Sequence, residues 1–159
     1  MPDAAELYQA IIDDHRRRPR HRGPLPSAHR VASAENPLCG DTCTIHLQFD
    51  PAPANASPLT PSTRIVAATF TGAGCALSQA SASLATAALA GLTPVQVLAL
   101  ATTIETLVRT GHPPAPEATD LPADSDLRAL AAVQALPARH PCALLIWQAT
   151  RQALANPHH

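Results

Sequence analysis

The spacing of apolar residues changes twice along this chain, and these changes restrict the fold more than any other feature of the sequence. From residue 4 to about 16, apolar side chains recur at helical spacing, and Asp3 can cap the start of that helix. Over residues 42–49 they alternate with polar side chains, which predicts a half-buried strand, and residues 64–71 predict a second strand that pairs antiparallel with it. Four helical segments follow, at about 75–90, 93–110, 125–136 and 142–155. This segregation of strands and helices indicates an α+β fold.

The composition indicates one domain with a core of small aliphatic side chains. The 159 residues suffice for one core but hardly for two, so we expect a single domain over residues 1–159. Apolar residues make up 46% of the chain but aromatic residues only 3%, so the core must consist largely of Leu, Val, Ile and Ala. Because small side chains bury little area each, the helices are expected to pack closely.

Charge and hydropathy exclude several classes of partner. The net charge of -1 provides no overall basic surface for nucleic acid or for an anionic membrane. No stretch approaches the length of about eighteen apolar residues that a membrane span requires. The first residues include acids and no apolar segment of the signal-peptide kind, so we expect a cytoplasmic protein whose four cysteines are thiols or metal ligands.

Two proline-rich stretches separate the predicted elements. After a first helix at 1–17, an Arg- and Pro-rich arm is predicted over 18–35, and a Pro-rich surface loop is predicted over 50–63. The arm is either solvated or a docking patch for an acidic partner surface. Its positive charge comes from Arg16, Arg17, Arg18, Arg20 and Arg22.

Four residues with metal-ligating side chains occupy favourable places in the sequence. Cys75 follows Gly-Ala-Gly and Cys142 follows a proline, so each is expected at a helix start, where unpaired N–H groups and the helix dipole favour thiolate over thiol. Cys39 and Asp41 flank Gly40, which allows the chain to turn both side chains toward one point. The four side chains could supply three thiolates and one carboxylate to zinc, which prefers four ligands of these kinds.

Other residues near this set have alternative interpretations. Arg139 could offset part of the negative charge of a metal site. Cys43 lies on the apolar side of its strand and is interpreted as a core residue. His140 could be a metal ligand, or the base of a Cys/His pair for nucleophilic hydrolysis. The remaining histidines outside the C-terminal tail, namely His15, His21, His29, His46 and His112, are interpreted as surface residues.

Three motifs occur in order along the chain: "NPLCGD" at 36–41, "GAGCALSQASAS" at 72–83 and "PARHPCALLIW" at 137–147. Together they resemble the U-type iron–sulfur cluster assembly proteins, the family of IscU, SufU and the N-terminal domain of NifU, and the resemblance covers nearly the whole chain. It implies a small antiparallel sheet of about three strands packed against five to six helices. It also implies a set of metal ligands, namely Cys39, Asp41, Cys75 and Cys142.

Within that family the sequence is most similar to the SufU type. The segment 112–136 matches a SufU-type insertion, and a proline rather than a histidine precedes the last cysteine. This resemblance implies a zinc-dependent sulfurtransferase of the bacterial cytoplasm. It would accept persulfide sulfur from a pyridoxal-phosphate-dependent cysteine desulfurase of the SufS type, on Cys39 or alternatively on Cys142, and pass it to a downstream scaffold or apo-protein. The alternative function is a scaffold that carries iron or a transient [2Fe-2S] cluster.

Overall fold

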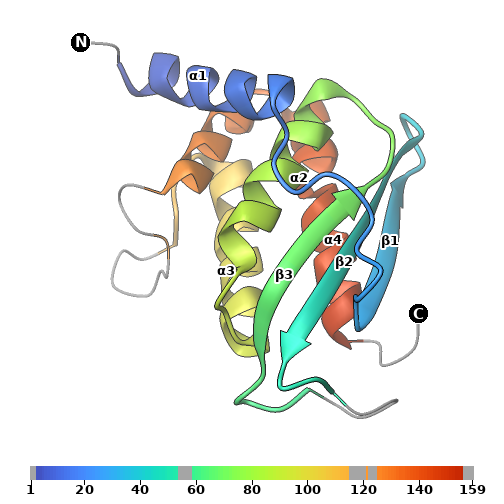
Figure 1. Ribbon diagram of the computed structural model, residues 1–159. Helices are drawn as coiled ribbons and strands as arrows, with labels where there is room; N and C mark the ends of the chain where they lie inside the picture. The colour runs from blue at the N-terminus through green and yellow to red at the C-terminus, as the bar shows by residue number, and fades with distance from the viewer. Residues whose placement is uncertain (1–2, 54–58, 115–120, 122–124, 156–159) are drawn as a thin grey trace.

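The computed structural model describes residues 3–53, 59–114, 121 and 125–155, and it contains a three-stranded sheet covered by helices (Figure 1). The strand order is β1-β2-β3, and both pairs are antiparallel. This arrangement confirms the predicted α+β fold. Parts of the predicted loop at 50–63 and of the insertion at 112–136 lie outside the described residues. The elements in chain order are α1 (Ala4–Arg17), β1 (Arg30–Asn36), β2 (Asp41–Asp50), β3 (Arg64–Thr71), α2 (Ala76–Leu89), α3 (Pro94–Thr110), the 3-10 helices η2 (Asp126–Ala135) and η3 (Pro137–Arg139), and α4 (His140–Ala155).

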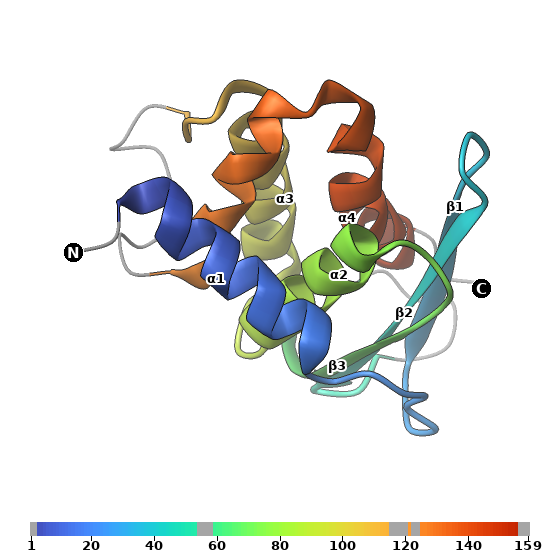
Figure 2. The ribbon, with the colours of Figure 1, turned by 90° about the horizontal axis from the view of Figure 1, so that it is seen from above.

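The helices and the N-terminal arm cover opposite faces of the sheet (Figure 2). On the helix side, β2 contributes Ile45, Leu47 and Phe49, all of them buried, and β2 packs against α4 while β3 packs against α2. The polar side chains between them lie on the other face, where Ser27 of the arm donates a hydrogen bond to Gln48 at 3.2 Å. The alternation in the sequence therefore corresponds to the two environments of the sheet.

The centre of the helical layer is α2, whose small side chains let other segments approach closely. All of its residues from 80 to 86 are almost fully buried, and each of them is Ala, Ser, Leu or Thr. Ser81 donates a hydrogen bond to the carbonyl of Ala143 in α4 at 2.6 Å. Ser83 Oγ lies 2.7 Å from His15 Nδ1 of α1 and accepts a hydrogen bond from the backbone N–H of Arg20 at 2.7 Å. His15 is therefore a buried residue, and its interpretation as a surface residue was wrong.

The arm predicted over 18–35 is not a free extended segment. Its last residues belong to β1, which pairs with β2 along its whole length. Nearer the start, the Phe70 N–H donates to the carbonyl of His21 at 3.0 Å and the Gly23 N–H donates to the carbonyl of Phe70 at 2.8 Å, so the arm also pairs with the outer edge of β3. Apolar and polar residues alternate only weakly in the sequence of β1, "RVASAEN". This edge strand has few large apolar side chains, so its pattern did not predict a strand.

The last part of the chain differs from prediction in the start of a helix and in helix type. α4 begins at His140, two residues before the predicted start, because the turn Pro137–Arg139 continues directly into it. A proline at 141 is compatible with this start, since the first turn of a helix needs no N–H donor there. The predicted helix at 125–136 is a 3-10 helix capped by Ser125. None of the helices in the described part of the chain is long and apolar enough to cross a bilayer.

The close packing of α2 leads to a prediction about stability. Replacing Ala85, which is 0% exposed, by leucine should lower the free energy of unfolding by about 1–3 kcal/mol, because the added atoms have no space between the packed elements. The exposed Ala87 on the same helix is the matched control, and Ala87→Leu should change stability by less than about 0.5 kcal/mol. Urea unfolding of both variants, followed by circular dichroism, measures the difference. Equal midpoints for the two variants would contradict close packing around α2.

Candidate metal centre

The four predicted ligands come from three distant parts of the sequence and meet at one end of the sheet. Cys39 lies in the turn between β1 and β2, Asp41 is the first residue of β2, Cys75 is the N-cap of α2, and Cys142 lies in the first turn of α4. One potential ligand atom from each of Cys39, Asp41 and Cys142 lies within 4.8 Å of the others. Cys75 is next to this group, because its N–H donates to Asp41 Oδ1 at 3.3 Å and its thiol interacts with both Asp41 and Cys142.

The turn "NPLCGD" is shaped by hydrogen bonds from its first residue. Asn36 Oδ1 accepts from the N–H of Leu38 at 3.1 Å, and the carbonyl of Asn36 accepts from the N–H of Gly40 at 2.8 Å. Gly40 has a φ of 75°, in the left-handed region that favours glycine. Because Asn36 and Asp41 are the last paired residues of the hairpin, this turn places Cys39 beside the carboxylate.

The glycine loop before α2 fits closely against the start of β2. A Cβ atom on Gly74 would lie 2.9 Å from Asp41 Cγ and 2.4 Å from Ser78 Oγ. The loop is held in register by the N–H of Thr42, which donates to the carbonyl of Ala73 at 2.8 Å. Only a residue without a side chain allows Cys75 to approach Asp41 in this way.

The Arg-rich arm also holds the glycine loop before α2 in position. No feature of the sequence indicated this contact. Arg22 donates from Nη2 to the carbonyl of Gly72 at 3.2 Å and from Nε to Gln79 Oε1 at 3.2 Å. Arg18 and Arg20 both form ion pairs with Asp14 of α1. Several of the arm's cations are thus engaged within the molecule, and docking of an acidic partner by this arm stays a prediction.

The Asp41 carboxylate is the most distinctive electrostatic feature of the cluster. Burial alone would raise the pKa of Asp41, but the nearby cysteine thiols and the N–H of Cys75 more than offset this and lower the pKa below its ordinary value. Within the described residues, Asp41 Oδ2 is buried and has no hydrogen-bond partner. A buried carboxylate oxygen without a hydrogen-bond partner is a favourable place for a cation, and the three sulfur atoms next to it form a donor set that suits zinc or iron.

The thiol of Cys142 is held in its neutral form by its surroundings. Cys142 is only 6% exposed, and burial together with the neighbouring Cys75 raises the pKa of Cys142 to about 12. The expectation that a helix start favours its thiolate is therefore wrong for the metal-free protein, because burial and negative neighbours outweigh the helix dipole. A bound cation would reverse this balance.

The other candidates from the sequence lie outside the cluster of four. Cys43 is a buried core residue, and burial raises its pKa to about 12. His140 is buried, and its Nε2 lies 3.1 Å from the carbonyl of Val133 and 3.2 Å from that of Gln134. Because carbonyls only accept hydrogen bonds, this nitrogen is protonated and cannot ligate a metal. Arg139 is exposed on η3, and its role in charge compensation stays a prediction.

The close approach of Gly74 to Asp41 leads to a prediction about metal binding. Gly74→Ala should weaken the binding of Co²⁺, a coloured probe for thiolate coordination, by about 10- to 100-fold, because the new methyl group displaces the carboxylate. Ser78→Ala removes the other close neighbour of Gly74 and should leave the affinity nearly unchanged. Absorbance titrations of both variants measure the two effects. Unchanged Co²⁺ affinity in Gly74→Ala would show that the position of Asp41 is unimportant for the metal.

Comparisons with known proteins agree with this geometry. Residues 7–143 match the family described as the NifU-like N terminal domain. The chain is 32% identical over 156 residues to the iron–sulfur cluster assembly scaffold protein IscU of Streptococcus pyogenes serotype M1, covering 96% of this chain and 87% of the relative. It is 30% identical over 150 residues to the zinc-dependent sulfurtransferase SufU of Bacillus subtilis (strain 168), covering 94% and 90%. The crystal structure described as a putative scaffold protein for the SUF system from Fervidobacterium islandicum AW-1 has a TM-score of 0.74 at 26% identity, covering 96% of this chain and 99% of that one. The chain therefore belongs to the NifU-like N-terminal domain family, together with IscU and SufU proteins.

Proposed function

We propose that this protein acts in iron–sulfur cluster assembly as a zinc-dependent sulfurtransferase. Its family membership supports the general role, and its 30% identity to a SufU named as a zinc-dependent sulfurtransferase supports the specific one. The observation that carries the proposal is the gathering of ligand atoms from Cys39, Asp41 and Cys142 within 4.8 Å, with Cys75 beside them. Soft sulfur donors with one carboxylate are a suitable environment for zinc.

The proposed zinc ligands are Cys39, Asp41, Cys75 and Cys142. When bound, zinc would supply the positive charge that keeps the thiols deprotonated. Three thiolates, one carboxylate and Zn²⁺ leave a net charge of about -2 at the site. Arg139, three residues before Cys142, is proposed to offset part of this charge.

Exposure distinguishes the two candidate sulfur acceptors. Cys39 is exposed on the turn between β1 and β2, whereas Cys142 is 6% exposed. An incoming persulfide can therefore reach Cys39 first. In the proposed exchange, the Cys39 thiolate attacks the outer sulfur of the persulfide, the old S–S bond breaks, and the donor cysteine leaves as a thiolate. Cys142 is the alternative acceptor, and it would receive the sulfur only after movement of its neighbours.

The proposed sulfur donor is a pyridoxal-phosphate-dependent cysteine desulfurase of the SufS type. Leu38, directly before Cys39, is 90% exposed and gives the tip of the turn an apolar contact for such a partner. The sulfur would then pass to a downstream iron–sulfur scaffold or apo-protein. Both transfers are exchanges between thiol and persulfide, so neither needs an external oxidant or reductant.

Replacement of the proposed acceptor gives the direct test. Cys39→Ala should abolish stimulation of a SufS-type desulfurase, because no exposed thiolate remains in the cluster to accept the sulfur. The matched control is Cys43→Ala, which removes a buried core thiol and should preserve most of the stimulation. Sulfide release after reduction measures the activity, and mass spectrometry of the unreduced protein detects the added sulfur atom.

Circular dichroism of the same variants separates sulfur transfer from a structural role of the metal. A folded but inactive Cys39→Ala supports transfer through this thiol. If Cys39→Ala unfolds, the metal is a structural element and the proposal fails. If Cys39→Ala still stimulates the desulfurase normally, Cys39 is not the acceptor.

The alternative function is a scaffold for cluster assembly, which the printed role of the Streptococcus pyogenes relative favours. Against it stands Pro141, which occupies the position directly before the last cysteine where scaffold-type members have histidine. Metal analysis of aerobically purified protein distinguishes the two functions. We expect a colourless protein with one zinc per chain, whereas a brown protein with paired iron and sulfide would establish the scaffold function instead.

A further inference from the structure

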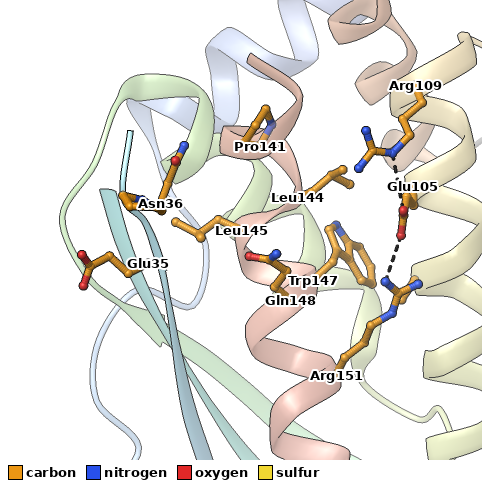
Figure 3. Close-up of a pocket in the computed structure, with 12 residues that line it drawn as sticks. Glu35, Asn36, Glu105, Arg109, Pro141, Leu144, Leu145, Trp147, Gln148 and Arg151 are labelled. Carbon is orange, nitrogen blue, oxygen red and sulfur yellow. Dashed lines mark hydrogen bonds and ion pairs between the residues drawn. The ribbon is translucent and has the colours of Figure 1, made fainter. Parts of the chain in front are cut away.

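A second polar site lies next to the cysteine cluster, along α4. It is a cavity of about 330 Å³ between the end of β1, α3 and α4 (Figure 3). This volume is at the lower end of the range for small-molecule sites, which is about 300–1,000 Å³. Pro141, Leu144 and Leu145 provide apolar walls, whereas α3 and the outer face of α4 contribute charged side chains.

The cavity wall contains a buried hydrogen-bond donor without an acceptor. Trp147 is 1% exposed, and within the described residues its indole Nε1 has no hydrogen-bond partner. Leaving such a donor unsatisfied in the interior destabilises the folded protein. The nitrogen itself is closed off from the cavity, so the indole ring lines the site without offering its N–H to a ligand.

Two arginines beside the indole share the single carboxylate of Glu105, so this side of the cavity carries one net positive charge. Arg151 donates from Nη1 to Glu105 Oε2 at 2.9 Å, and Arg109 donates from Nε to Glu105 Oε1 at 3.4 Å. Both oxygens of Glu105 are thus occupied. No hydrogen bond or ion pair engages the terminal nitrogens of Arg109 within the described part of the chain, and Figure 3 shows its guanidinium directed toward the cavity. A free guanidinium fork matches a carboxylate.

The opposite wall restricts the charge of the ligand. Glu35 lies beside Asn36 at the other side of the cavity, away from the arginines (Figure 3). A second negative charge on the ligand would approach this carboxylate and be repelled. The lining therefore favours one carboxylate group on a short apolar body over a polyanion.

We propose that this cavity binds a small monocarboxylate, with the carboxylate at the terminal nitrogens of Arg109 and the apolar part against Leu144 and Leu145, beside the indole ring of Trp147. None of the four predicted ligands lines the cavity, although Asn36 belongs to the turn that carries Cys39 and Pro141 precedes Cys142, and the proposal does not depend on sulfur transfer. Its experiment also needs no desulfurase, so its outcome is independent of the proposed function.

Trp147 is the only tryptophan of the chain, so its fluorescence reports directly on the cavity. We expect pentanoate to produce a saturable change in the emission of the complete protein, with a dissociation constant on the order of 1 mM for so small a ligand. Pentanamide has the same shape without the charge and should produce little change, as should sodium chloride at equal ionic strength. Citrate should bind more weakly than pentanoate because of Glu35.

Substitution of the free arginine identifies the site. Arg109→Gln should weaken pentanoate binding about tenfold or more, as the loss of a charge-assisted hydrogen bond requires. Arg64→Gln changes an arginine that does not line the cavity and should bind pentanoate normally. Ligand-observed NMR repeats each measurement without relying on fluorescence. The proposal is overturned if neither method detects saturable pentanoate binding, if pentanamide binds equally well, or if Arg109→Gln binds as tightly as the unchanged protein.

Discussion

The buried carboxylate of Asp41 is the constraint on which the arrangement of the other elements depends. It stands at the end of the β1–β2 hairpin, where the register fixes it opposite Asn36. One oxygen is satisfied by the N–H of Cys75, which requires the glycine loop to pass close to β2. Because burying an ionised group is costly unless it is compensated, the sheet, the loop and the first turn of α4 meet where the N–H of Cys75 and the surrounding thiols stabilise the carboxylate.

The N-terminal arm stabilises this meeting point from the outer side of the sheet. Its backbone extends the edge of β3 at Phe70, and the side chain of Arg22 reaches the loop that carries Cys75. Arg20 binds Ser83 through its backbone and Asp14 through its side chain, so the arm also connects α1 with α2. A segment rich in arginine and proline therefore acts here as a structural strap, whatever surface it also offers to a partner.

The sequence allowed prediction of those features that local patterns determine. The alternation at 42–49 indicated β2. Glycines and helix starts beside Cys39, Asp41, Cys75 and Cys142 indicated one site, and the structure brings ligand atoms of Cys39, Asp41 and Cys142 within 4.8 Å of one another. Features that depend on tertiary contacts were not predictable. Apolar and polar residues alternate only weakly in β1, at the sheet edge, and His15 becomes buried only when α1 packs on α2. The raised pKa of the Cys142 thiol results first from burial and then from Cys75, far away in the sequence.

The cysteine cluster and the cavity both border α4, but they contain unpaired buried groups of opposite hydrogen-bonding type. Asp41 Oδ2 is a buried acceptor without a donor, whereas Trp147 Nε1 is a buried donor without an acceptor, within the described residues. Cys142 and Trp147 are five residues apart on α4, which places them about 140° apart around the helix axis. A cation is proposed for the first face, and a carboxylate is proposed for the second, at Arg109. Because the two proposed ligands carry opposite charges, the first turns of α4 carry two proposed sites of different chemistry.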